Sequence, residues 1–176
     1  MHLRIQLQHD ESDCAAACLA MILNYYGKAV SIRKLRIAAG TDTQGTSGYG
    51  IKACAEQYGL SCKGFTDPEK KSLKNIPFPA IFHVRKESIE HYVVVDSIKN
   101  GKVRIFDPAD GIDKMPLSDF ENWWSGVFFL LCPCDNFEKE KEDKTPIIRF
   151  FSLLKPHTLL LSKIIVSSII LTVFGV

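Results

Sequence analysis

The feature that most constrains this chain of 176 residues is an apolar segment that directly follows a polar run. Polar residues fill positions 8–13, small and apolar residues follow, and Gly27 stands at the end of the segment. Ser12 or Asp13 can cap a helix and glycine can end one, so the pattern predicts a helix over residues 13–26. Because this helix is apolar on nearly every face after its first turn, it must be buried in the middle of a domain.

Cys14 falls in the first turn of the predicted helix. The dipole and the free backbone N–H groups of a first turn favour a thiolate. The alanines at 15–17 add little bulk around the sulfur. Gln8 lies upstream and offers a neutral amide donor of the kind that binds an oxyanion. Since most free cysteines are buried small hydrophobes, Cys14 is a candidate nucleophile only if a base lies close to it.

A histidine that could act as this base opens a β-branched run at 91–96, which is typical of a strand. A second strand ends at Asp107 because a proline follows, and an Asn-Gly pair at 100–101 indicates a hairpin between the two. A two-residue loop would send His91 and Asp107 to opposite faces. A three-residue loop, or an equivalent bulge, keeps both on one face, and we predict this register. His91 and Asp107 then become diagonal neighbours within side-chain reach.

The remaining histidines are weaker candidates for the base. His9 adjoins Gln8 but has no orienting carboxylate at a useful position, and His83 lies in an apolar strand where a structural role is expected. A cysteine on a helix, a histidine on a strand and an aspartate that orients the histidine form a nucleophile, base and orienter arrangement.

Two multi-residue motifs resemble those of a known family. The cysteine motif covers residues 8–36 and the histidine motif covers residues 91–111. Both resemble the papain-like cysteine peptidase domain of bacteriocin-exporting ABC transporters, the double-glycine leader peptidases. The resemblance extends over residues 1–133 as a peptidase domain. One departure is Ala15, because the family often has glycine directly after the nucleophile.

The resemblance implies that Cys14 is the nucleophile, His91 the general base and Asp107 its orienter, with Gln8 in the oxyanion hole. It implies an endopeptidase that removes the leader of a bacteriocin or lanthipeptide-type precursor after Gly-Gly, Gly-Ala or Gly-Ser. In the full-length protein this reaction would be coupled to ATP-driven export, by a homodimer, at the cytoplasmic face of a bacterial cell membrane. One alternative is a non-cleaving docking domain that binds the leader, and another is a papain-like acyltransferase or transglutaminase-type enzyme.

The rest of the pattern predicts an α+β fold with helices first and an antiparallel sheet after, which is the papain-like order. Further helices are expected at 32–39, 48–58 and 117–124, and further strands at 61–65, 80–84, 111–115 and 126–131. Trp123 and Trp124 could line a substrate cleft, but one ring in the core and one on the surface is the simpler interpretation.

Charge and cysteine usage narrow the functional class. The net charge is +2 and no basic stripe is interleaved with aromatic residues, so nothing indicates nucleic-acid binding. Six cysteines without a signal peptide are ordinary for a reducing compartment, and their spacings do not fit a zinc site. Cys18 is expected to pack, with a redox pairing to Cys14 as the alternative. We expect no cofactor in this fragment, and ATP and Mg²⁺ only for an ATPase domain outside it.

The composition changes after Pro133. Residues 134–145 mix charges of both signs and predict a solvated linker. Residues 146–158 combine apolar and basic side chains and predict an interfacial helix. Residues 159–176 carry a single charge, Lys163, and are typical of the start of a truncated transmembrane helix. We therefore expect an N-terminal fragment of a longer membrane protein.

Overall fold

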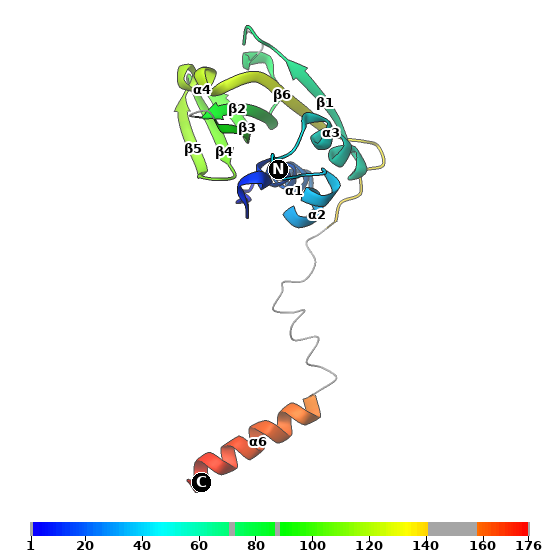
Figure 1. The fold of residues 1–176 in the computed structure, drawn as a ribbon, viewed down its shortest axis with the longest axis vertical. Coiled ribbons are helices and arrows are strands. Elements are labelled where there is room, and N and C mark those ends of the chain that lie inside the picture. The colour runs from blue at the N-terminus through cyan, green and yellow to red at the C-terminus, as the bar shows by residue number, and fades with distance from the viewer. Residues whose placement is uncertain (1, 71–72, 87–88, 141–157, 176) are drawn as a thin grey trace. The chain divides into compact units, whose positions relative to one another are not determined.

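The computed structural model describes residues 2–70, 73–86, 89–140 and 158–175. The chain divides into two compact units, residues 1–141 and 142–176, which are described separately. In the first unit, helices come first and an antiparallel sheet follows, so the α+β class predicted from the sequence is confirmed (Figure 1). Its helices are the 3-10 turn η1 (Glu11–Asp13), α1 (Cys14–Tyr26), α2 (Ile32–Ala38), α3 (Gly48–Gln57), the 3-10 turn η2 (Leu73–Asn75) and α4 (Leu117–Trp123).

Helix α1 is the buried centre of this unit, as its composition predicts. Every residue from position 14 to position 23 is buried. The helix ends at Gly27, whose φ of 96° lies in the left-handed region and whose N–H caps the carbonyl oxygens of Leu23 and Asn24. A left-handed C-cap is the conformation for which glycine carries no steric penalty. The sequence therefore fixes both the burial of α1 and the point where it ends.

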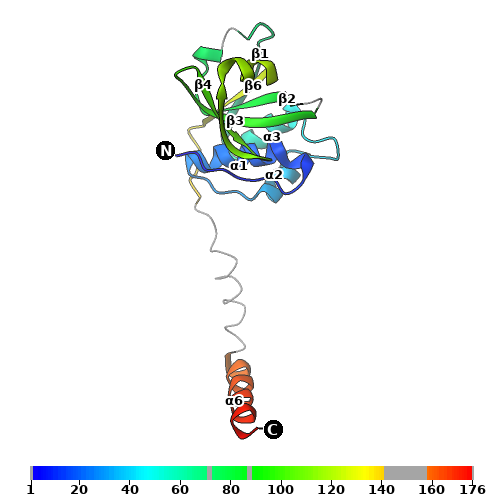
Figure 2. The same ribbon diagram turned by 90° about the vertical axis from the view of Figure 1, so that its left-hand side faces the viewer.

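The sheet has six strands in the order β1-β6-β2-β3-β4-β5, with every neighbouring pair antiparallel. Its strands are β1 (Leu60–Thr66), β2 (Ala80–Lys86), β3 (Ile89–Lys99), β4 (Lys102–Asp107), β5 (Gly111–Pro116) and β6 (Trp124–Pro133). Figure 2 shows α1, α2 and α3 gathered on one side of this sheet. α1 packs against β3, and both contribute to one apolar cluster. A second cluster on the sheet includes Val93, Val95, Ile105 and the α4 residue Phe120.

The hairpin of β3 and β4 has the predicted register, and a bulge rather than a three-residue loop produces it. The three-residue loop is wrong, because Lys99 pairs with Lys102 across a two-residue turn. A shift between Val95 and Ser97 supplies the equivalent bulge, and Val95 pairs with Ile105 as predicted. The turn needs positive φ at both central residues, which an Asn-Gly pair readily adopts. The bulge restores the common face of His91 and Asp107.

Residues 134–140, which the sequence places in a charged linker, fold back on the first unit. The N–H of Cys134 donates to the carbonyl oxygen of Gly59 at 3.0 Å. The backbone carbonyl oxygen of Glu140 accepts from the N–H of Ala29 at 2.8 Å, and the centre of the Phe137 ring lies 6.4 Å from that of the Tyr26 ring. Residues 141–157, which include nearly all of the predicted interfacial helix, lie outside the described residues.

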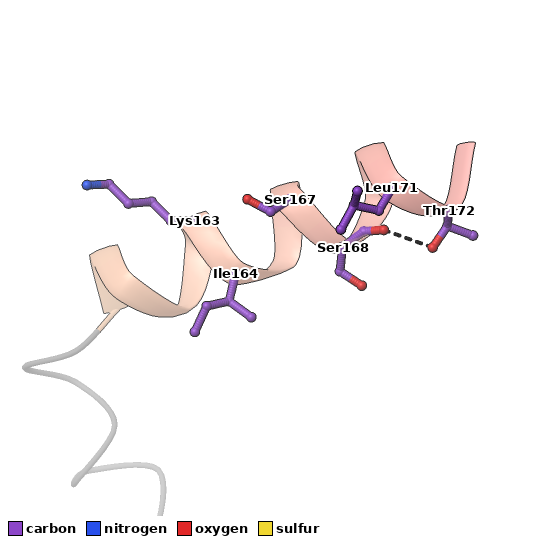
Figure 3. Close-up of a pocket in the computed structure, with 6 residues that line it drawn as sticks. All are labelled: Lys163, Ile164, Ser167, Ser168, Leu171 and Thr172. Atoms are coloured by element: carbon purple, nitrogen blue, oxygen red, sulfur yellow. Dashed lines mark hydrogen bonds between the residues drawn. The ribbon is translucent and has the colours of Figure 1, made fainter. Parts of the chain in front are cut away.

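The second unit contains α6 (Thr158–Phe174), a helix rich in exposed apolar side chains such as Ile164 and Leu171. Figure 3 shows Ser167, Ser168 and Thr172 along the same helix. The Thr172 hydroxyl donates to the carbonyl oxygen of Ser168 at 2.8 Å, so its polar group is satisfied within the helix (Figure 3). Among the residues that the structure describes, no helix combines the length and the apolar character needed to cross a membrane.

Candidate active site

Cys14 lies where α1 begins and lines a cleft. The short turn η1 comes directly before it, so the sulfur sits at the corner between the two helical segments. Only 6% of Cys14 is exposed. A cleft of about 230 Å³ nevertheless reaches this residue, and its other lining residues are Glu11, Ser12, Thr43, Gln44, Gly45, Thr46, His83, Ile89, Glu90 and Tyr92. A small group can therefore approach the thiol from solvent.

His91 and Asp107 are brought together as the hairpin register predicts. Nε2 of His91 donates to Oδ1 of Asp107 at 2.8 Å, and both side chains are buried. The N–H of Ala109 donates to the same carboxylate oxygen at 2.8 Å and holds it in place. These bonds fix the orientation of the imidazole ring, since a buried carboxylate with two donors has little freedom to rotate.

The charges at this site favour a protonated His91. Burial alone would lower the pKa of His91, but hydrogen bonds to Asp107 and Cys14, together with their negative charge, raise it to about 9. Burial alone would raise the pKa of Asp107, but the hydrogen bonds from His91 and Ala109 hold it below its usual value. At neutral pH the ring is therefore an imidazolium that is held by the Asp107 carboxylate and interacts with Cys14.

Gln8 belongs to an extended arm that is tied to the loop after β4. Its backbone N–H donates to the carbonyl oxygen of Pro108 at 2.9 Å, directly after Asp107. Its side-chain oxygen Oε1 is buried and has no hydrogen-bond partner within the described parts of the chain. Buried polar atoms are normally paired, so this oxygen shows that the amide is not fully engaged by the fold.

Asp13, next to Cys14, has a different partner from the one that its position suggests. It stands at the N-cap position of α1, but its side chain makes no capping hydrogen bond to the described helix. Instead, the Arg36 guanidinium of α2 donates to Oδ1 of Asp13 at 2.6 Å, and the aspartate is buried. A buried carboxylate needs such a charged partner. The pair joins α2 to the corner that carries Cys14.

His83 lines the cleft, whereas the two tryptophans and His9 are not among its lining residues. His83, expected to have a structural role, lines the cleft together with Cys14. Trp124 is buried in the second cluster, and Trp123 is half-buried with the Lys86 ammonium 5.2 Å from its ring centre. His9 is exposed. The sequence offered no signal for the place of His83, because the apolar residues around it are those of any buried strand.

The other cysteines are free thiols. Cys18 is fully buried and its thiol donates to the carbonyl oxygen of Tyr92 at 3.3 Å. Burial, and then the charges of Cys14 and Asp107, raise the pKa of Cys18 well above its usual value. Cys18 therefore packs as a protonated thiol. Within the described ranges, no cluster of histidine, cysteine, aspartate or glutamate side chains is arranged to hold a metal ion.

The helix-then-sheet architecture, with thiol and imidazole on facing elements, is that of a papain-like cysteine peptidase. The model of the peptidase C39 family matches residues 2–136, which is most of the chain. The chain therefore belongs to the peptidase C39 family, a family of cysteine peptidases.

Relatives from bacteria match nearly the whole chain. The lactococcin-G-processing and transport ATP-binding protein LagD of Lactococcus lactis is 36% identical over 175 residues, which are 98% of this chain and 24% of LagD. The transport/processing ATP-binding protein ComA of Streptococcus pneumoniae is 31% identical over an alignment of 179 positions, which covers 99% of this chain and 25% of ComA. The chain thus spans about a quarter of the length of these relatives.

Solved structures of similar domains share the fold. The peptidase domain of Streptococcus ComA, a bifunctional ABC transporter involved in quorum sensing, is 31% identical with a TM-score of 0.70, covering 75% of this chain and 99% of that domain. A double-glycine-motif protease from an AMS/PCAT transporter, solved in complex with the leader peptide, is 33% identical with a TM-score of 0.69. That match covers 75% of this chain and 92% of the protease.

Proposed function

We propose that Cys14, His91 and Asp107 form the catalytic triad of a leader peptidase, with Gln8 in its oxyanion hole. The observation that carries this proposal is the position of His91, which hydrogen-bonds Asp107 at 2.8 Å and lies close enough to Cys14 for that residue to raise its pKa. A nucleophile, a base and an orienter in contact are the parts that covalent hydrolysis needs.

The proposed reaction proceeds through an acyl-enzyme. The Cys14 thiolate attacks the scissile carbonyl carbon, and a carbon–sulfur bond forms. The His91 imidazolium gives its proton to the leaving amine as the peptide bond breaks. Water, deprotonated by His91, then cleaves the thioester and releases the acid, and the thiolate–imidazolium pair is restored. The Gln8 amide and the backbone N–H of Cys14 stabilise the oxyanion, a role for which one donor typically contributes about 100- to 1000-fold in turnover.

The proposed substrate is a precursor peptide with a double-glycine leader. The similarity to a protease solved with its leader peptide and to bacteriocin-processing proteins supports this class. Within this class, the proposed cut follows Gly-Gly, Gly-Ala or Gly-Ser.

We further propose that the chain acts as the peptidase part of a longer exporter. The relatives are transport/processing ATP-binding proteins of which this chain spans about a quarter. ATP and Mg²⁺ would then serve an ATPase domain outside these residues, in a homodimer. Residues 159–176 would begin a transmembrane helix, and the peptidase would face the cytoplasm. The interfacial helix at 146–158 and the linker before it stay predictions of the same kind.

The position of the cut tests this function. The chain of residues 1–176, kept in mild detergent, is incubated with a synthetic peptide that carries an amphipathic leader, Gly-Gly and a short cargo, and the products are weighed by mass spectrometry. We expect a single cut after the second glycine. A matched peptide with leucine in place of that glycine should be cut far more slowly. Binding without any cleavage would favour the docking domain instead, and equal cleavage of the two peptides would contradict the proposed specificity.

A further inference from the structure

His83 is a half-buried histidine at the cleft to which the catalytic triad gives no role. It lies on β2, pairs with Tyr92 of β3, and lines the same cleft as Cys14. Its side chain is only 13% exposed. The hydrogen-bond partners of the ring decide which of its two nitrogens can donate to a ligand and which can accept.

A bulge in β6 determines how the ring is held. Val84 pairs with Trp124 and Phe82 with Phe128, so three residues of β6 stand opposite His83 alone. The first of the three, Ser125, donates its hydroxyl proton to the carbonyl oxygen of His83 at 3.0 Å. The same hydroxyl oxygen lies 2.8 Å from Nδ1 of the His83 ring.

These two contacts assign the protonation of the ring. A serine hydroxyl has one proton, and here the proton is directed to the carbonyl oxygen of His83. The hydroxyl oxygen must therefore accept a hydrogen bond from Nδ1, which makes Nδ1 the N–H side of the ring. Burial, and then the charges of Arg85 and His91 against the opposing charge of Glu90, lower the pKa of His83. At neutral pH the ring is neutral, and Nε2 carries a lone pair.

Nε2 of His83 and a carboxylate oxygen of Glu90 are both acceptors, so a ligand that binds between them must be a hydrogen-bond donor. Oε2 of Glu90 lies 3.8 Å from Nε2, and Glu90 lines the cleft as well. Two acceptors at this separation do not bond each other, but a donor between them can satisfy both. The Tyr92 ring, 5.0 Å from the His83 ring, limits how far the imidazole can tilt.

We propose that His83 is a substrate-positioning residue whose Nε2 accepts a hydrogen bond from a backbone N–H of the peptide in the cleft, with Ser125 fixing the ring. The proposal rests on the proposed function, since it names a contact to the same substrate. A peptide backbone supplies an N–H donor at every residue but proline, whatever its side chains. His83 would thus hold the substrate in register with Cys14 without selecting for a side chain.

The contact should be lost when His83 is protonated. The charged groups that face the ring are Glu90 and Arg85 from the adjoining strand residues and His91 beside them. The carboxyl group of Glu11 lines the same cleft. On protonation, Nε2 becomes a donor that pairs with Glu90, so it can no longer accept from the substrate. Substrate binding should therefore weaken as the pH falls below the ordinary range of histidine.

Steady-state kinetics with the double-glycine peptide test the contact. His83→Phe should raise KM about five- to tenfold, the worth of one hydrogen bond, and leave kcat within about twofold. Ser125→Ala should raise KM in the same direction because the ring is then free to turn. His83→Gln keeps an oxygen acceptor that does not titrate, so it should restore most of the affinity and remove the rise in KM at acid pH. His2→Phe, at an exposed histidine, is the control.

A binding measurement separates this inference from the proposed function. The Kd of the peptide is compared between Cys14→Ala and the double variant Cys14→Ala/His83→Phe, where no cleavage occurs. We expect a five- to tenfold weaker Kd in the double variant, by about the same hydrogen-bond contribution as above. An unchanged Kd or KM in folded His83 variants, with thermal unfolding as the check, overturns the role of His83. Absence of cleavage by the native chain contradicts the proposed function alone.

Discussion

At the scale of single residues, the site depends on how three side chains share protons. His91 lies between the Asp107 carboxylate and the Cys14 thiol, and these contacts outweigh the effect of burial on its pKa. The sequence predicted the pairing of His91 with Asp107, because strand alternation and the hairpin loop limit the register to few choices. It did not predict the partner of Asp13, because a residue before a helix can cap that helix or pair with a distant arginine.

The pKa of His91 sets the pH dependence of the proposed reaction. The imidazolium form gives the proton to the leaving amine, and the pKa of His91 is about 9, so cleavage should persist through neutral pH and decline above that value. Asp107→Asn removes the carboxylate charge that helps raise this pKa. We expect its alkaline decline to move to lower pH and its kcat to fall by at least about tenfold.

The measurement is the pH profile of kcat/KM for the native chain and for Asp107→Asn. Asp110→Asn, a change at an exposed carboxylate a few residues away, is the matched control and should keep the native alkaline limb. An alkaline limb that does not move in Asp107→Asn would show that Asp107 does not act on His91 in the working enzyme.

At the scale of elements, two bulges shape the site. The bulge of β3 follows from the sequence in outline, since His91 and Asp107 share a face only if an extra residue is accommodated. The bulge of β6 was not foreseeable, because Ser125, Gly126 and Val127 read as part of an ordinary strand or its start. For this reason the position of His83 at the cleft was missed. Local pattern predicts which residues form strands, but it does not predict where a ladder skips residues.

Gly126 makes the β6 bulge possible. Its φ is 91°, and a Cβ atom there would lie 2.8 Å from the carbonyl oxygen of Asp67. Gly126→Ala should therefore lower the free energy of unfolding by about 2 kcal/mol or more, since it combines backbone strain with a steric clash. Gly111→Ala is the matched control, with a φ of 101° and nothing within 4 Å of the added atom.

Urea unfolding of both variants measures the difference. Gly111→Ala carries the backbone cost without the clash, so it should be less destabilising than Gly126→Ala. An equal loss of unfolding free energy in the two variants would mean that the bulge relaxes around the new methyl group. The close approach of Gly126 to Asp67 would then not contribute to stability.

At the scale of the whole molecule, the sequence predicted the α+β fold, the order of helices and strands, and the family. The buried helix α1, its glycine cap and the two motifs carry that information because they serve both the core and the chemistry. The charged residues after Pro133 indicated a solvated linker and gave no sign that residues 134–140 contact the first unit. Phe137 lies within this segment, packs near Tyr26 and sits beneath the Lys28 ammonium, 5.3 Å from its ring centre. A single apolar side chain in a charged segment does not reveal such an anchor.

The most direct test of the account is the rate at which Cys14→Ala cleaves the double-glycine peptide. The chain with Cys132→Ala, a change at an exposed cysteine, is assayed beside it to separate loss of the nucleophile from loss of any thiol. The account predicts no detectable cleavage by Cys14→Ala, native rates for Cys132→Ala, and the same thermal unfolding for both. Cleavage by Cys14→Ala at the native rate would contradict the proposed nucleophile and the mechanism built on it.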